Sequence, residues 1–238
     1  MSIITIILIL IGVIIVYFAT KFLGKAFKIV TKIMLLLVVI MMVLTLLVYK
    51  DMNELRNGFA EQNNTFLLYD DNKIYTAITL KPLLSNNLNI ESFSYFNKLD
   101  IEEAEKNLNE ENYDAVLKNN YKILIIKPSV LNKSYKIKLS IEIDQDDLIE
   151  LIKSDIPFKV LAYKVAEEHN VSVPELELGF KQAYGSQEKF KGYLFAALLS
   201  NYLQKQNPGD LVDNLKEKNI IVYPESISFK VVRYLPWV

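Results

Sequence analysis

The sequence opens on two apolar stretches, IITIILILIGVIIVYFA at residues 3–19 and IMLLLVVIMMVLTLLVY at residues 33–49. A helix over either stretch rises roughly 25 Å, which is a short but adequate length for a membrane span. Two buried helices of a soluble core are the alternative, but a soluble fold would have to cover both of them on every side. The start of the chain has no basic side chain, which disfavours a cleaved signal peptide. The pattern predicts an N-terminal transmembrane α-hairpin.

Four lysines and no acidic residue separate the two stretches: Lys21, Lys25, Lys28 and Lys32. On a helix they would fall within an arc of roughly 60°, where they could bind lipid headgroups. Alternatively, the last of them begin the second helix and extend to the membrane interface. Lysine-rich connectors stay in the cytoplasm, so we expect a protein of the cytoplasmic membrane with this connector inside and both termini outside.

The remainder of the chain is acidic and contains no cysteine. Five of the 27 basic residues lie in the first fifty positions, which leaves 22 basic and 28 acidic side chains after them and a net charge of about −6. Nucleic acid is therefore not an expected partner, because phosphate contacts need a basic surface. The absence of cysteine excludes disulfides, thiol nucleophiles and thiolate metal sites.

Three regions follow from this organisation. Residues 1–50 are the predicted two-helix anchor, residues 51–64 a polar stalk, and residues 65–238 a domain displayed outside the membrane. The length of the last region is enough for one domain with its own core.

Alternation of apolar and polar side chains predicts the strands of this domain. A hairpin is expected at residues 65–80, because Asp70-Asp71-Asn72 supplies turn residues between two β-rich runs. The most regular alternation covers residues 135–143. Further extended segments are predicted at residues 90–97, 121–127, 220–223 and 226–234.

Apolar periodicity and capping residues predict the helices. Capping boxes are expected at Asp100 with Glu103 and at Ser172 with Glu175. The widest apolar stripe marks residues 187–205 as the central helix. The other helices are expected at residues 113–118, 145–153, 157–169, 174–184 and 209–218. Strands first, helices next and strands last indicate an α+β domain with a mostly antiparallel sheet and a helical layer.

Ser186 and Lys189 have the Ser-x-x-Lys spacing found in serine acyl enzymes that resemble penicillin-binding proteins. The companion Lys-Thr-Gly is missing, and a serine at the start of a predicted helix is more often an N-cap. These two residues are therefore weak candidates for catalysis, and helix capping is the favoured interpretation.

Asp144, Asp146 and Asp147, with Glu150 nearby, form the densest group of carboxylates and are weak candidates for a metal site. The glycine and the bidentate glutamate of an EF-hand loop are both missing. Acidic side chains in the first turn of a helix are also favourable without any metal. The single histidine, His169, cannot build a multi-histidine site, and we expect no cofactor.

The end of the chain carries Tyr234 and the only tryptophan, Trp237. Packing of a terminal strand is the plain interpretation, and a tail that docks onto a protein partner or a bilayer is the alternative.

No coherent catalytic set emerges from these motifs. The sequence therefore predicts a membrane-anchored, non-enzymatic binding, scaffold or assembly component, with the lipid bilayer and a membrane or surface protein as its partners. The alternatives are a membrane-bound hydrolase or transferase that uses carboxylates or Ser186, and an accessory subunit of a larger membrane complex.

Overall fold

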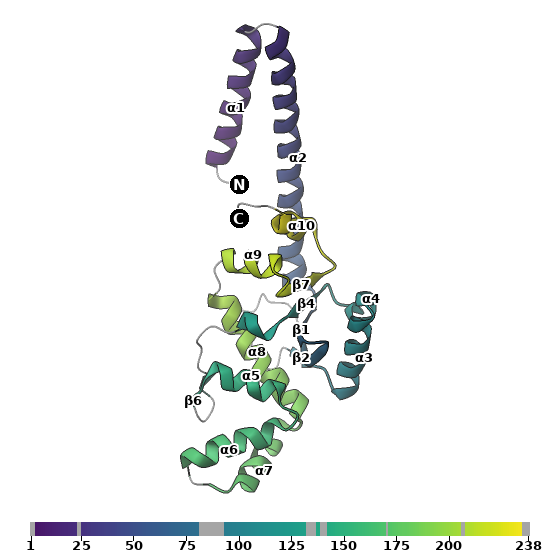
Figure 1. Cartoon of the computed structure of the whole chain (residues 1–238), viewed down its shortest axis with the longest axis vertical. Coiled ribbons are helices and arrows are strands. Elements are labelled where there is room, and N and C mark those ends of the chain that lie inside the picture. Colours follow the sequence, from purple (N-terminus) through teal and green to yellow (C-terminus); the bar gives the residue numbers. More distant parts are fainter. Residues whose placement is uncertain are drawn as a thin grey trace. The chain divides into compact units, whose positions relative to one another are not determined.

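The computed structural model describes residues 3–22, 25–80, 93–131, 137–138, 142–169, 171–205 and 208–234, and Figure 1 names its helices and strands. The chain divides into two compact units, Met1–Asn53 and Glu54–Val238. Each unit is described by itself below.

The first unit consists of helix α1 (Ile3–Phe22) and most of helix α2 (Lys25–Glu61). Many of its large apolar side chains are exposed, among them Ile29 with 64% and Met41 with 63% of their surface. Apolar surface on this scale usually marks an interaction region. Nothing in the described part of the chain shows what covers it.

Among the helices of the described residues, none combines the length and the apolar character needed to cross a membrane. The predicted two-span transmembrane hairpin is therefore wrong, and so are the membrane anchor and the placement in the cytoplasmic membrane with both termini outside. Each apolar stretch covers only part of its helix, because α1 runs on to Lys21 and α2 carries lysines in its first turns and polar residues in its last turns. The lysines also form no separate connector, because Lys21 lies in α1 and the other three lie in the first turns of α2.

The segment predicted as a stalk, residues 51–64, is the end of α2 and the start of the sheet. The last turns of α2, from Glu54 onward, belong to the second unit and pack within it. The ring of Phe59 packs edge-on against that of Tyr121, with 6.0 Å between centroids, and the Tyr121 hydroxyl donates to the carbonyl of Glu54.

The second unit is built on a sheet of five strands in the order β3-β2-β1-β4-β7. Their bounds are Asn64–Asp70 for β1, Lys73–Leu80 for β2, Phe93–Tyr95 for β3, Lys122–Ile126 for β4 and Ile220–Tyr223 for β7. The α+β class is confirmed. The sheet is mixed rather than antiparallel throughout, because β1 pairs with β4 in parallel.

The predicted hairpin at residues 65–80 is confirmed, since β1 and β2 pair antiparallel across it. Asp71 and Asn72 hold its turn with positive φ angles of 49° and 62°. Asp and Asn tolerate this conformation better than most residues, and it suits the tight turn that a twisted hairpin needs.

Helices cover both faces of the sheet (Figure 1). On one face, helices α3 (Lys98–Asn109) and α4 (Tyr113–Leu117) bury Leu67, Ala77 and Ile123. On the other face lie α5 (Gln145–Lys153), α6 (Pro157–His169), α7 (Val173–Tyr184) and α8 (Gln187–Lys205). As predicted, α8 is the central helix, and its Phe190, Leu194 and Phe195 are fully buried.

Two predicted strands are wrong. Residues 135–143 were expected as one strand, but Ile137–Lys138 (β5) and Glu142–Ile143 (β6) pair with each other as a small hairpin, and residues 139–141 lie outside the described residues. Residues 226–234 contain helix α10 (Ile227–Tyr234). Ser226 begins it by accepting a hydrogen bond from the amide of Phe229 on its side chain, so capping overrides the apparent alternation.

The predicted helix starts need smaller corrections. The capping box of α3 is made by Asn97 and Asp100, so this helix begins earlier than the predicted start at Asp100. Ser172 begins α7 without a side-chain hydrogen bond, so the predicted box with Glu175 is wrong. The remaining elements are the 3-10 turn η2 (Pro128–Leu131) and helix α9 (Pro208–Lys216).

Lys118, which ends α4, has φ 50° and ψ −121°, a backbone conformation that glycine adopts at lower cost than other residues. We expect Lys118→Gly to stabilise the protein by about 1 kcal/mol in urea unfolding. Its exposed ion pair with Glu103, at 3.8 Å, contributes little. Lys118→Ala loses the same ion pair and keeps the strain, so an equal gain in that variant would contradict the explanation.

Candidate functional site

The structure gives Ser186 the role of an N-cap. Its Oγ accepts a hydrogen bond of 3.1 Å from the backbone amide of Lys189, and the amide of Phe190 donates to its carbonyl at 3.1 Å. The favoured interpretation of this motif is therefore confirmed. The contact between the two candidate residues runs through the backbone of Lys189, whose side chain is exposed. A catalytic role stays an untested prediction.

The carboxylates at the start of α5 have partners within the protein. Asp144 caps the helix by accepting a 3.0 Å hydrogen bond from the amide of Asp147. The ammonium group of Lys164 contacts Asp147 Oδ1 and lies 3.4 Å from Glu150 Oε2. The hydrogen bond to Asp147 raises the pKa of Lys164, so a lysine is the cation of this group. Asp146 is exposed, and over the described residues no three acidic or histidine side chains gather closely enough to hold a metal.

The other predicted contact residues are not brought into a site. Lys21 and Lys32 are exposed, and Lys25 and Lys28 lie in α2. His169 ends α6 and Tyr234 ends α10. Trp237 lies outside the described residues. Contact with lipid and a docking tail therefore remain predictions.

The outer edge of β7 is a different kind of site. This strand is last in the sheet and pairs only with β4. The amide of Lys127 donates to the carbonyl of Asn219, so the backbone groups of Asn219 point toward β4. In an antiparallel pair every second residue points the same way, so the backbone groups of Ile221 and Tyr223 also point toward β4. The N–H and C=O groups of Ile220 and Val222 consequently face away from the sheet, where no strand of the described residues meets them.

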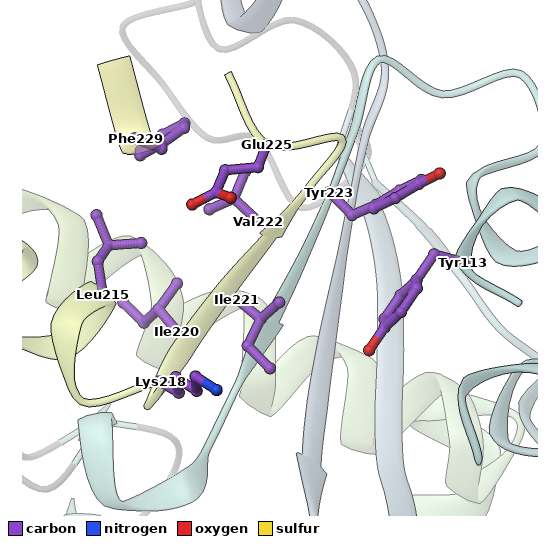
Figure 2. Close-up of a pocket in the computed structure, with 9 residues that line it drawn as sticks. All are labelled: Tyr113, Leu215, Lys218, Ile220, Ile221, Val222, Tyr223, Glu225 and Phe229. Carbon is purple, nitrogen blue, oxygen red and sulfur yellow. The ribbon is translucent and has the colours of Figure 1, made fainter. Parts of the chain in front are cut away.

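A cavity of about 280 Å³ follows this edge. Figure 2 shows Ile221, Tyr223 and Tyr113 on one side of β7 and residues from α9 and α10 on the other. Since all four residues of β7 line the cavity and both faces of the sheet contribute to it, the cavity lies against the open edge. The lining residues are Tyr113, Leu215, Lys218, Ile220, Ile221, Val222, Tyr223, Glu225 and Phe229.

One wall of this edge groove is held by stacked tyrosines. The rings of Tyr113 and Tyr223 lie 5.1 Å apart at an angle of 24°, and the Tyr223 hydroxyl donates a 2.7 Å hydrogen bond to Asp114 Oδ1. This hydrogen bond raises the pKa of Tyr223, so the phenol stays neutral. The opposite wall is apolar and includes Leu215 and Phe229.

The two ends of the groove carry opposite charges. Lys218 precedes β7 and is exposed, with a positive φ of 57° where the chain leaves α9. Glu225 follows β7 at the other end, after Pro224. Charged residues and prolines beside a short strand are typical of sheet edges. This signal is visible in the sequence, although by itself it does not identify the edge.

Compared with known proteins, the chain matches no family model, no curated protein and no solved structure.

Proposed function

We propose that this protein is a non-enzymatic assembly component whose α+β domain binds a second copy of itself by pairing β7 with β7. The single observation that carries the proposal is the open edge of β7, which has outward backbone groups, a groove along its length and opposite charges at its ends.

The backbone groups of Ile220 and Val222 support pairing with a strand. Unpaired N–H and C=O groups at a sheet edge are a template for a further strand, which satisfies them by hydrogen bonds. Ile220 and Val222 as whole residues are only 4% and 7% exposed, so their side chains are fixed in the core and little of their backbone is open to solvent in the single chain. A strand that pairs here finds these two residues already ordered, and it must displace the atoms that cover their backbone groups.

The charges support a second copy as the partner. In an antiparallel pair with the two Ile221 residues opposite each other, Ile220 of each copy pairs with Val222 of the other. The same register brings Lys218 of each copy to the end where Glu225 of the other lies. The contact is therefore self-complementary, as a two-fold interface requires.

Val222→Pro tests the proposal. Proline removes the outward N–H of Val222 and leaves the hydrogen bonds between β4 and β7 intact, a placement that edge strands tolerate. We expect the purified full-length wild type to self-associate in sedimentation velocity experiments and the variant to lose that association, with an unchanged circular dichroism spectrum. A wild type whose association is unaffected by Val222→Pro would overturn the proposal.

Amide hydrogen exchange gives a local readout that other contacts of the chain do not affect. The amides of Ile220 and Val222 should become more protected as the protein concentration rises, while the amide of Ile221, which faces β4, should not change. Lys218→Glu should weaken association by about two- to tenfold, and adding Glu225→Lys should restore it. Failure of the double variant to restore association would exclude this register.

A further inference from the structure

A second cavity, distinct from the edge groove, lies where four segments of the second unit meet. It has a volume of about 580 Å³ and opens between the start of β2, the start of α3, the turn between α5 and α6, and the first turns of α8. Its lining residues are Lys73, Ile74, Tyr75, Lys98, Ile101, Glu102, Glu105, Asp155, Gln187, Glu188 and Lys191. We call it the lysine cleft.

Most charged groups of the lysine cleft have a partner in it. Lys73 Nζ lies 3.6 Å from Asp155 Oδ1, and Lys98 Nζ lies 4.0 Å from Glu102 Oε1. Glu105 accepts a 2.8 Å hydrogen bond from the backbone amide of Ile74. Lys191 differs, because its amine makes no hydrogen bond or ion pair with any residue in the described ranges, although it lines the same cavity.

The surroundings of Lys191 disfavour its charged form relative to that of an exposed lysine. Burial lowers its pKa from the ordinary value of 10.5, and the positive charge of Lys73 acts in the same direction. Asp155 and Glu188 act in the opposite direction and do not reverse the shift. Lys98, Glu102 and Glu105 complete the charged groups of the cleft. Lys191 therefore has a larger fraction of the neutral amine, which is the nucleophilic form, than an exposed lysine has.

From the cavity, the absence of an ion pair and the position of the amine, we propose that Lys191 is an imine-forming site for small uncharged aldehydes. The amine nitrogen attacks the carbonyl carbon, and a C–N bond forms as the C=O electron pair moves to oxygen. Both N–H hydrogens then leave with that oxygen as water, and a C=N bond remains. No oxidant or other co-reactant is needed.

The lining of the lysine cleft indicates the class of aldehyde. When Lys191 reacts as the neutral amine, the charges of Lys73 and Lys98 face four carboxylates, so the cleft is acidic and disfavours an anionic ligand. Tyr75, Ile74 and Ile101 supply the apolar wall. A short aliphatic aldehyde fits this combination better than a phosphorylated or a dicarboxylic one.

Competitive labelling tests the proposal. The full-length protein is treated at pH 7.5 with limiting propanal and cyanoborohydride, which traps an imine as a propyl amine, and each lysine is quantified by peptide mass spectrometry. Lys189 is the matched internal control, because it lies two residues away on α8 and is exposed. We expect Lys191 to be labelled several times faster, since each unit of pKa depression raises the neutral fraction about tenfold.

Lys73→Met tests whether Lys191 reacts fast because its pKa is lowered or only because it is accessible. Removing the Lys73 charge takes away a repulsion and frees Asp155 to attract the ammonium form of Lys191, so labelling of Lys191 should slow while that of Lys189 does not change. Lys191→Arg should abolish the fast-labelled site. Labelling of Lys191 no faster than Lys189, or at a rate indifferent to Lys73→Met, would overturn the proposal.

Discussion

Phe190→Ala is expected to lower the free energy of unfolding of the second unit by about 3–5 kcal/mol. Phe190 lies in the first turn of α8 and has no exposed surface. Its ring centroid is 5.2 Å from that of Phe158 in α6 and 4.7 Å from that of Tyr184 at the end of α7. Truncation would remove the side chain on which three helices converge. The space left behind can collapse only if those helices move, which adds a cavity term to the lost burial.

The measurement is amide exchange in the central strand β1, because its amides open only when the core of this unit unfolds. Lys189→Ala is the matched control, one residue earlier on the same helix. Its side chain is exposed, and the amide that donates to Ser186 remains, so the change should stay within about 0.5 kcal/mol. A loss below about 1 kcal/mol for Phe190→Ala would show that α8 does not organise this core.

The importance of α8 could be read from the sequence because it depends on local information. The apolar stripe of residues 187–205 gave both ends of the helix correctly, and the turn at Asp71 and Asn72 gave the first hairpin. The strand predicted at residues 226–234 was wrong because the apolar positions there fit a strand as well as a helix. Only the hydrogen bond that caps the helix at Ser226 decides between the two. The parallel pairing of β1 with β4 joins segments more than fifty residues apart, a choice that no local pattern fixes.

The two candidate sites could not be predicted from the sequence, again because they depend on contacts between distant segments. Residues 220–223 were correctly predicted as a strand, but which strand ends the sheet depends on the order of all five strands. Lys191 lies inside a correctly predicted helix, and its environment comes from β2, α3 and the turn at Asp155. The residues that stood out by spacing, Ser186 and Asp144, are N-caps, because serine and aspartate at helix starts imitate catalytic and metal-binding patterns.

Gly192→Leu is expected to destabilise the second unit by about 1–3 kcal/mol, although glycine is a poor helix former. Gly192 lies in α8 where this helix packs against β2 and β3. A Cβ atom added there would be 3.0 Å from Cβ of Tyr95 and 3.3 Å from Cγ2 of Ile78. The first contact involves an atom next to the backbone of β3, so it cannot be relieved by rotating a side chain. The remainder of a leucine side chain would push α8 away from the strands.

Gly179→Leu in α7 isolates the steric effect, because a Cβ atom there meets nothing within 4 Å. This exposed helical position gains helix propensity without a clash, so we expect stabilisation of up to about 0.8 kcal/mol. The two substitutions are chemically identical, and opposite signs in urea unfolding would assign the difference to the contact between α8 and the sheet. Two gains of similar size would contradict that contact. They would also weaken the description of the lysine cleft, since the same packing of α8 against β2 positions Lys191 beside Lys73 and Tyr75.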